Sequence, residues 1–391
     1  MKTIYLDNAA TTRVYPKVAE KMHFMLTENY ANPLSPHSLG QKAMIEINAA
    51  RKIIAHSLNV NSANIVFTSG GSEANNLAIK GIAFGHMRKN NAKSASDMVR
   101  KKIITTKIEH ESVISACNDL EMFGFEVVRI KCDKEGFINL DSLKKEIDED
   151  TLIVSIIHAN NEIGTIQDIA KIAELCTEKS AFFHTDCVQS FTKHAINLKN
   201  VDLASISAHK IHGPKGTGAL YVNDRAKKIL SPIINGGGQE FSLRAGTHNS
   251  AGIAGFAEAV KLCKYDADRM KSKMKILFDS IIRECSEIAR IEINGPSLDA
   301  ANRLQNILNL RFIGIDSYRL LLALDSMGVM VSQGSACSTG SSKASHVLKA
   351  LSLSDDDARS SIRISISEDN SDYELMEVGR IFADSIKKIR E

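Results

Sequence analysis

Short runs of apolar and β-branched residues alternate with segments that carry apolar residues at helical spacing. Helical segments such as Glu73–Phe84 and Asp168–Cys176 lie between several of these runs. Strands that alternate with helices predict an α/β fold with a mostly parallel, doubly wound sheet. The last two runs follow each other closely, which favours a hairpin and one antiparallel edge. The seven predicted strands are Ile65–Thr68, Ile103–Thr106, Glu126–Ile130, Leu152–Ile157, Phe182–Thr185, Leu203–Ser207 and Ala219–Val222.

The pattern changes after about residue 260. A long helical stretch from Asn249 to about Ile288 leads to shorter and more widely spaced strands. We therefore expect a smaller α+β domain, joined to the first domain through this long helix. Its predicted strands are Ile307–Arg311, Val329–Val331 and Ile362–Ile366, and its predicted helices are Tyr318–Met327, Ala344–Leu351 and Tyr373–Arg390.

Composition narrows the function classes. The 391 residues carry 49 Lys and Arg against 46 Asp and Glu, so the net charge of +3 gives little attraction for nucleic acid or anionic lipid. Apolar runs are too short for a membrane span, and the N-terminus has no signal-peptide pattern. Seven cysteines without a C-x-x-C pair predict reduced thiols in a cytoplasmic protein, and we expect no metal site.

Candidate chemistry lies where predicted strands end, because open α/β sheets bind ligands there. The segment Thr68–Glu73 reads strand, glycine turn, helix start, which is typical of an anion cradle and also of a plain helix cap. Asp186 ends an apolar strand, where it could pair with a protonated pyridine nitrogen or simply cap the next helix.

Two nucleophile candidates follow. Lys210 comes directly after a very apolar strand, a setting that makes an amine lose its proton readily, although a surface lysine is commoner. Cys337 lies in the Ser/Gly-rich segment 332–343, which is typical of a mobile loop and suits a reactive thiol better than a core position. Nucleotide-binding glycine motifs are absent, which removes support for a nucleotide-binding regulator.

Together these motifs resemble the class V aminotransferases, specifically the cysteine desulfurases of the iron–sulfur-assembly (NifS/IscS-like) type. The resemblance covers nearly the whole chain. The segments that carry it are 6–12, 68–76, 158–164, 207–210, 236–240, 244–249 and 361–365. It implies the type I fold of transferases that depend on pyridoxal 5′-phosphate (PLP). The large domain would span 16–262, and a small domain would comprise 1–15 and 263–391 with the cysteine loop.

The resemblance also implies residue roles. Lys210 would hold PLP covalently, Asp186 would pair with the pyridinium, and His110 would stack on the ring and assist proton transfer. Gln189 and Asn161 would contact the ring oxygen, while Arg363 with Asn161 would bind the substrate carboxylate. Cys337 would accept the sulfur. The phosphate would be held by Gly71, Ser72, Ser207 and His209, with Thr247 reaching in from the partner of a homodimer.

The implied reaction converts L-cysteine to L-alanine and leaves sulfur as a persulfide. An iron–sulfur scaffold or a tRNA-thiolation relay would receive it. Cys187 stands beside the cofactor acid where the family commonly has alanine, so it is either an inert neighbour or a second thiol. The polar segment 88–102 reads as a solvated insertion. A selenocysteine lyase or another class V aminotransferase of the same fold is the alternative, and a non-catalytic scaffold is a third hypothesis.

Overall fold

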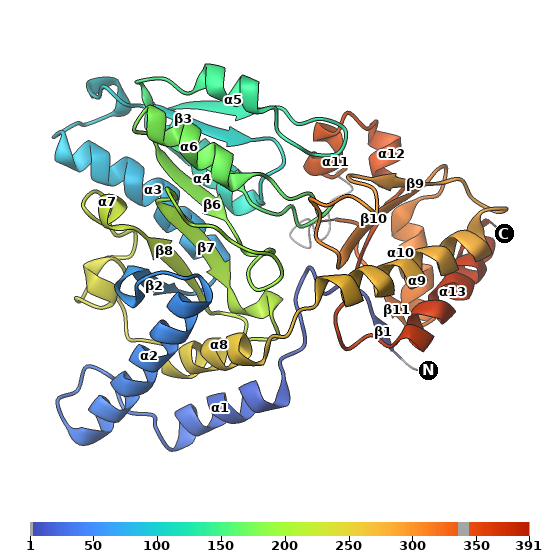
Figure 1. Ribbon diagram of the computed structural model, residues 1–391, viewed down its shortest axis with the longest axis horizontal. Coiled ribbons are helices and arrows are strands. Elements are labelled where there is room, and N and C mark those ends of the chain that lie inside the picture. Colours follow the sequence, from blue (N-terminus) through green and yellow to red (C-terminus); the bar gives the residue numbers. More distant parts are fainter. Residues whose placement is uncertain (1–2, 335–343, 391) are drawn as a thin grey trace.

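The computed structural model describes residues 3–334 and 344–390. Two lobes lie side by side along the longest axis, and both ends of the chain belong to the smaller lobe (Figure 1). Cys337 lies outside the described residues. No helix in the described part of the chain combines the length and apolar composition that a membrane crossing requires.

A seven-stranded sheet forms the centre of the larger lobe, as predicted, in the order β2-β8-β7-β6-β5-β3-β4. One prediction was wrong: β8 is antiparallel to both neighbours but is second from the edge, because β2 pairs along its outer side. The strands are β2 (Ile65–Thr68), β3 (Lys102–Thr106), β4 (Glu126–Ile130), β5 (Thr151–Ile157), β6 (Phe182–Asp186), β7 (Leu203–Ser207) and β8 (Gly218–Val222).

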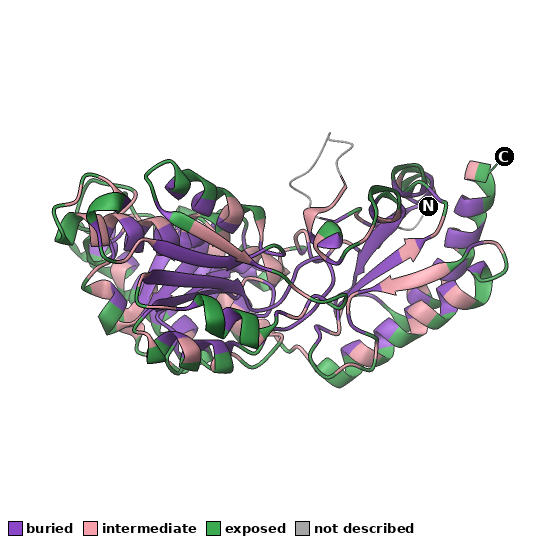
Figure 2. Ribbon diagram, turned by 90° about the horizontal axis from the view of Figure 1, so that it is seen from above, coloured by how far each residue is buried: buried purple, intermediate pink, exposed green. Residues whose placement is uncertain are grey.

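Helices cover both faces of this sheet, and its strands are largely buried (Figure 2). Successive strand residues point to opposite faces: Ile103 packs in a core with α3 and α4, whereas Ile104 packs in a second core with α2, α6 and α8. This explains why the strands read as continuous apolar runs. The helices are α1 (Pro16–Thr27), α2 (Ser38–Ser57), α3 (Gly71–Lys89), α4 (Glu111–Glu121), α5 (Leu140–Glu146), α6 (Ile169–Glu178), α7 (Asp224–Lys227) and α8 (Ser250–Leu262).

The smaller lobe contains a three-stranded antiparallel sheet, ordered β12-β10-β9, and a parallel pair of β1 with β11. The sequence pattern did not predict β1, β9 or α12. The strands are β1 (Ile4–Tyr5), β9 (Ile291–Asn294), β10 (Ile307–Phe312), β11 (Val329–Met330) and β12 (Ser361–Ser365). The helices are α9 (Ala267–Cys285), α10 (Ser317–Ser326), α11 (His346–Ala350), α12 (Asp355–Arg359) and α13 (Asp372–Arg390).

The predicted long helix across the lobe boundary was also wrong, because α8 and α9 are separate helices. Cys263 has extended backbone angles, and Asp266 begins α9 by accepting a hydrogen bond from the Arg269 amide at 3.0 Å. A capping aspartate competes with continued helix, so the chain turns here between the lobes. The polar segment 88–102 is likewise only partly solvated, since Ala95 and Met98 lie in the core.

Candidate active site

Loops at the carboxyl ends of the parallel strands meet residues of the smaller lobe around a cavity of about 200 Å³. This is where an open α/β sheet is expected to bind its ligand. Of the predicted site residues, Gly71, Ser72, His110, Asn161, Asp186, Gln189, His209, Lys210 and Arg363 line the cavity. Ala9, Ala10, Asn75, Ile157 and Val188 complete its lining.

Lys210 lies in a short 3₁₀ turn that directly follows the carboxyl end of β7, and its side chain lines the cavity. Its Nζ donates to the carbonyls of Ala9 and Ala10, at 2.6 and 2.7 Å. Burial, together with the positive charge of Arg363, lowers the pKa of Lys210 to about 7. A large fraction of this amine is therefore neutral and nucleophilic near neutral pH. Lys215, the neighbouring lysine, is exposed.

Asp186 ends β6 and is 3 % exposed. Its Oδ2 accepts from Asn75 Nδ2 at 2.7 Å, and its Oδ1 accepts from the Val188 amide at 2.9 Å. These donors hold the carboxylate at the cavity wall. Asn75 was not assigned a role from the sequence, although it lies one helical turn from Ser72 and so shares its face of α3.

The strand, glycine turn and helix start predicted at residues 68–73 are present at the start of α3. Gly70 has a φ of +153°, and the first hydrogen bond of the helix runs from the Ala74 amide to the Gly70 carbonyl. The amides of the first helical turn thus have no partner within the helix. At Gly71 a Cβ would lie 2.6 Å from Val188 Cγ2, so only glycine permits this approach. Ser207 is almost fully buried, and its Oγ has no hydrogen-bond partner among the described residues.

Two histidines border the cavity. His110 caps α4, and its Nδ1 lies 2.8 Å from Ser112 Oγ. His209 lies 3.3 Å from Thr11 Oγ1 through its Nδ1, and burial lowers the pKa of His209 to about 3. His209 is therefore a neutral imidazole that can hydrogen-bond an anion without adding a charge.

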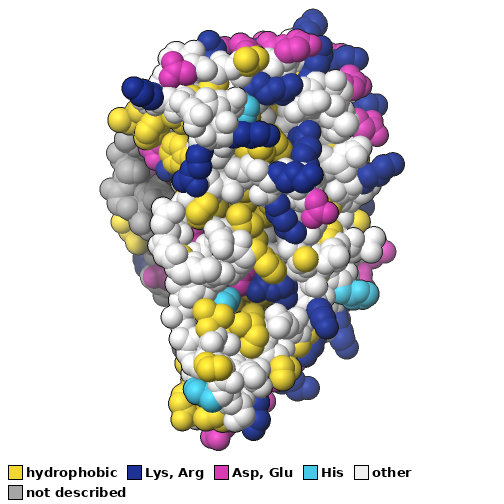
Figure 3. All heavy atoms as spheres, turned by 90° about the vertical axis from the view of Figure 1, so that its left-hand side faces the viewer, with side chains coloured by type: hydrophobic (Ala, Val, Ile, Leu, Met, Phe, Trp, Pro, Cys, Tyr) yellow, Lys and Arg dark blue, Asp and Glu magenta, His cyan; other side chains and the backbone are white. Residues whose placement is uncertain are grey.

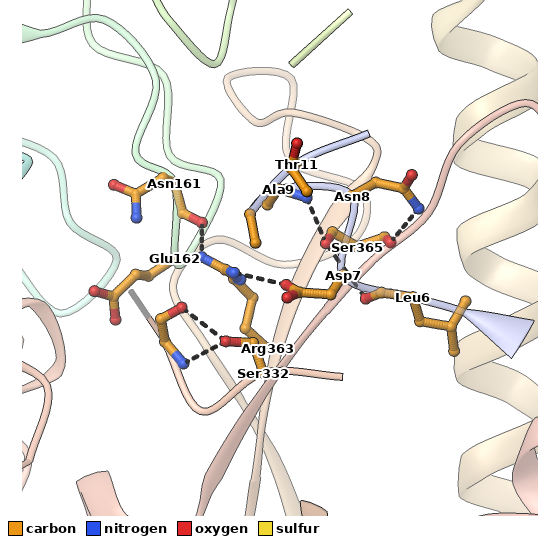
Figure 4. Close-up of polar contacts among 12 residues, drawn as sticks. Leu6, Asp7, Asn8, Ala9, Thr11, Asn161, Glu162, Ser332, Arg363 and Ser365 are labelled. Carbon is orange, nitrogen blue, oxygen red and sulfur yellow. Dashed lines mark hydrogen bonds and ion pairs between the residues drawn. The ribbon is translucent and has the colours of Figure 1, made fainter. Parts of the chain in front are cut away.

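Arg363 on β12 brings the smaller lobe into the site (Figure 4). Its Nη1 donates to the Asn161 carbonyl at 3.1 Å, and its Nη2 lies 2.8 Å from Asp7 Oδ1. Nε is buried without a partner in the described chain. The resemblance implied that Arg363 with Asn161 binds the substrate carboxylate; the structure adds an ion pair between Arg363 and Asp7, which the sequence did not predict.

Three predicted site residues are not among the described residues that line the cavity: Ser207, which is buried at the end of β7, Thr247 and Cys337. Thr247 is exposed and does not line the cavity of its own chain, and Cys337 lies outside the described residues. Cys187 is fully buried, and burial beside Asp186 raises the pKa of its thiol to about 12. It is thus a structural neighbour rather than a reactive thiolate.

Comparison with known proteins places the chain. The family profile for class-V aminotransferases matches residues 4–378. The chain belongs to the class-V aminotransferase family. Its curated class-V relatives include a protein named cysteine desulfurase IscS from Clostridium botulinum, 42% identical over all of this chain and 96% of the relative. Another is named putative cysteine desulfurase IscS 1, from Bacillus subtilis, and is 40% identical over both full lengths.

Solved class-V structures agree with this assignment. A NifS-like protein is 34% identical, covers 99% of both chains and gives a TM-score of 0.86. A structure described as SspA in complex with cysteine is 37% identical, covers 93% of this chain and 99% of its own, and gives a TM-score of 0.80. The seven-stranded, mostly parallel sheet of this chain is therefore that of NifS-like class-V proteins.

Proposed function

We propose that this chain is a PLP-dependent cysteine desulfurase, which converts L-cysteine to L-alanine and leaves the sulfur as a persulfide on Cys337. The observation that carries the proposal is the shared cavity of Lys210, Asp186 and Arg363. A low-pKa amine, a fixed carboxylate and a guanidinium are what a PLP enzyme for amino acids needs. The names of the relatives supply the substrate.

The residues present fit PLP. The open amides at the start of α3 and the unpartnered Ser207 Oγ suit a phosphate, and the neutral His209 can bond to it. Asp186 suits a protonated ring nitrogen, and Lys210 suits the covalent link. The unpartnered Oε1 of Gln189 and Oδ1 of Asn75 are buried, as expected for polar groups whose partner is a ligand.

When bound, PLP withdraws electrons from the substrate Cα. The remaining steps, which are proton transfer and orientation of the substrate, are carried out by side chains of the cavity. Lys210 Nζ removes the Cα proton, because its lowered pKa leaves it able to accept one at neutral pH. Asp186 holds a proton at the ring nitrogen, and Arg363 with Asn161 orients the substrate carboxylate. His110 stands at the cavity wall and assists proton transfer.

The sulfur transfer involves only the thiol of the substrate cysteine and the thiol of Cys337, and its atoms and electrons balance between them. The Cys337 thiolate attacks the substrate sulfur, a sulfur–sulfur bond forms, and the Cβ–sulfur bond breaks. The substrate carbon is reduced by two electrons and takes a proton, while the enzyme thiol becomes a persulfide. No external oxidant is needed. An iron–sulfur scaffold protein or another acceptor protein then receives the sulfur, and a tRNA-thiolation relay is one such acceptor.

The test is to incubate the purified protein with cysteine and a reductant, with and without added PLP, and to measure alanine and sulfide. Equal amounts of the two support the proposal, whereas a keto acid indicates an aminotransferase. Without reductant, mass spectrometry should find one added sulfur, about 32 Da, on the Cys337 peptide. Cys337→Ser should abolish both products, and Cys263→Ala is the matched control.

We also propose a homodimer in which Thr247 reaches the partner's phosphate site. The loop that carries Thr247 is held by a buried network: Arg51 makes two hydrogen bonds to Glu240, at 2.7 and 2.6 Å, and His248 Nε2 lies 2.9 Å from the same carboxylate. Three successive residues of this loop, Glu240, Phe241 and Ser242, have positive φ. Strain of this kind persists where the surroundings hold the backbone in one shape, which supports a function for the exposed Thr247.

Exposed apolar side chains on α1 and α2 support the same dimer. Figure 3 shows apolar side chains gathered toward the lower end of this face, where α1 and α2 lie in Figure 1. Such a gathering is typical of a protein interface. The large exposed apolar residues of these helices and their connection are Phe24, Leu26, Tyr30, Leu34, Leu39 and Ile45.

The domain division and location complete the proposal. We propose a large domain of residues 16–262 and a small domain of 1–15 with 263–391, because the connection at residues 263–266 leads from one lobe to the other. We propose a cytoplasmic location, which suits the free thiols of the six described cysteines.

A further inference from the structure

The two ends of the segment 335–343, which contains Cys337, meet at one carboxylate. Ser345 Oγ donates a hydrogen bond to Glu162 Oε2 at 2.6 Å. On the other side, Gly334 packs against the same group: a Cβ built there would lie 2.8 Å from Glu162 Oε2, and the φ of Gly334 is +153°. Glycine is therefore required at this position. The chain leaves the described structure and re-enters it beside the same oxygen atom.

Glu162 is itself firmly held and is 1 % exposed. Its amide donates to Asn160 Oδ1 at 2.8 Å, and its carbonyl accepts from Asn309 Nδ2 at 3.3 Å. The adjoining Asn161 lines the cavity and bonds to Arg363. The side chain of Glu162 points away from the pair of Arg363 and Asp7 (Figure 4). It therefore serves the segment ends, not the cavity.

Two further contacts tie the same ends to cavity residues. On the leading side, the Ser332 amide donates to the Arg363 carbonyl at 3.1 Å, and the Arg363 amide donates to the Ser332 carbonyl at 2.6 Å. On the returning side, His346 Nε2 lies 2.9 Å from the carbonyl of Glu109, the residue before His110. Both ends are thus placed relative to Arg363 and His110.

We infer that Glu162 is a positioning residue for sulfur transfer: its carboxylate bonds to the Ser345 end of the cysteine segment and packs against the Gly334 end, next to the cavity. The inference rests on the proposed function. Holding the two described ends of a segment reduces the orientations that the segment between them must search, which raises the rate of the transfer without tightening substrate binding. Glu162 is not a catalytic residue, since it does not line the cavity.

The choice of variant matters, because Ser345 has two roles. Its Oγ also accepts from the Leu348 amide at 3.2 Å and so caps α11. Replacing Ser345 by alanine would remove the cap and the Glu162 contact together. Glu162→Ala removes only the contacts of the Glu162 carboxylate with Ser345 and Gly334, which we call the clasp. Glu162→Gln keeps an oxygen that can accept from Ser345 and serves as the conservative control.

The experiment uses full-length enzyme reconstituted with PLP. Three quantities are measured for wild type, Glu162→Ala and Glu162→Gln: the absorbance change on cysteine titration, the single-turnover rate of sulfur addition to the Cys337 peptide, and hydrogen exchange of residues 344–348. We expect Glu162→Ala to slow sulfur addition roughly tenfold or more, with cysteine affinity within about twofold of wild type. Exchange at 344–348 should rise, and Glu162→Gln should stay within about threefold of wild type in all three.

Three results would overturn the inference: a wild-type rate of sulfur addition in Glu162→Ala, a parallel loss of cysteine affinity, or failure of Glu162→Gln equal to that of alanine. If Glu162→Ala does not fold, Ser345→Asp replaces it. That variant keeps an N-capping oxygen but sets a second carboxylate against Glu162, and a wild-type rate there equally contradicts the inference. A wild type that forms neither alanine nor persulfide refutes the proposed function instead, and the hydrogen-exchange difference then still tests the clasp.

Discussion

Arg363 and Asp7 form an ion pair at the lobe junction, with Nη2 2.8 Å from Oδ1 and the arginine side chain 1 % exposed. A buried guanidinium is costly unless it is paired, so Asp7 permits Arg363 to stand in the cavity wall before any substrate arrives. The unpartnered Nε leaves a donor for a substrate carboxylate. In the proposed function, the substrate carboxylate would therefore share this arginine with Asp7.

Arg363→Ala should raise the KM for cysteine by about thirtyfold or more, which corresponds to a lost charge-assisted pair of roughly 2 kcal/mol. PLP affinity should change far less, because Arg363 is assigned to the substrate carboxylate. Steady-state kinetics and PLP titration measure the two effects. Arg311→Ala, on β10 and paired with Glu292 and Asp357, is the control. An unchanged KM would place the carboxylate site elsewhere.

Lys210→Ala should abolish the absorbance of the lysine-bound cofactor, because Lys210 is the one amine among the described residues that line the cavity. The exposed Lys215 supplies the control, and Lys215→Ala should keep the absorbance. Borohydride reduction of the wild type followed by peptide mapping checks the assignment directly. Cofactor found on Lys215 would remove Lys210 from its role.

Asp186→Asn should retain some PLP but lose most turnover, by about a hundredfold, because an amide cannot stabilise a proton on the ring nitrogen. The Asn75 and Val188 donors to this side chain would face a weaker acceptor, so some loss of stability should accompany the change. Turnover and bound PLP are measured on the same preparation. Near-normal turnover would exclude Asp186 from the mechanism.

Glu109 predicts a pH dependence of stability. Burial raises the pKa of Glu109 to about 8, although Thr106 and the Ile157 amide bond to its Oε1. The folded protein therefore holds a proton that the unfolded chain loses above about pH 4.5, and stability from this group is lost as pH rises from about 4.5 to 8.

Glu109→Gln should remove that dependence. In the cofactor-free protein, the free energy of unfolding of wild type relative to the variant should fall with pH by up to about 1.4 kcal/mol per unit over this window. Urea unfolding at several pH values measures the difference. Parallel curves for the two proteins would show that Glu109 is not protonated in the fold.

The larger sheet was predictable because its strands are buried on both faces and read as continuous apolar runs. Lys210 and Asp186 could be singled out as candidates for a related reason, since a charged residue at or just past the end of an apolar strand stands out, but only the family resemblance gave them roles. The helix break at 263–266 has no glycine or proline to mark it. It depends on Asp266 and on Tyr265 packing against the small-lobe core, a contact that forms only in the tertiary structure.

The clasp at Glu162 and the pairing of Arg363 with Asp7 could not be predicted from local pattern. Asp7 lies 356 residues from Arg363, and Glu162 lies 183 residues from Ser345. No periodicity relates such positions, because the contacts are created by the way the lobes fold together. Asp7 and Glu162 lie inside the motif segments 6–12 and 158–164, and nothing in those motifs indicated that the two carboxylates contact Arg363 and Ser345.

The N-terminal segment has a consequence for how the protein is made. Asn8 bonds to the Ser365 carbonyl across 357 residues, and Ile4 pairs beside Val329. Residues 4–8 therefore reach their place only after residues 329 and 365 have been synthesised. Until then Lys210 Nζ cannot form its hydrogen bonds to the carbonyls of Ala9 and Ala10. The large sheet can form earlier, but Lys210 gains these two carbonyl partners only after residue 365 has been made, so the site proposed to hold the cofactor is completed after the sheet that carries it.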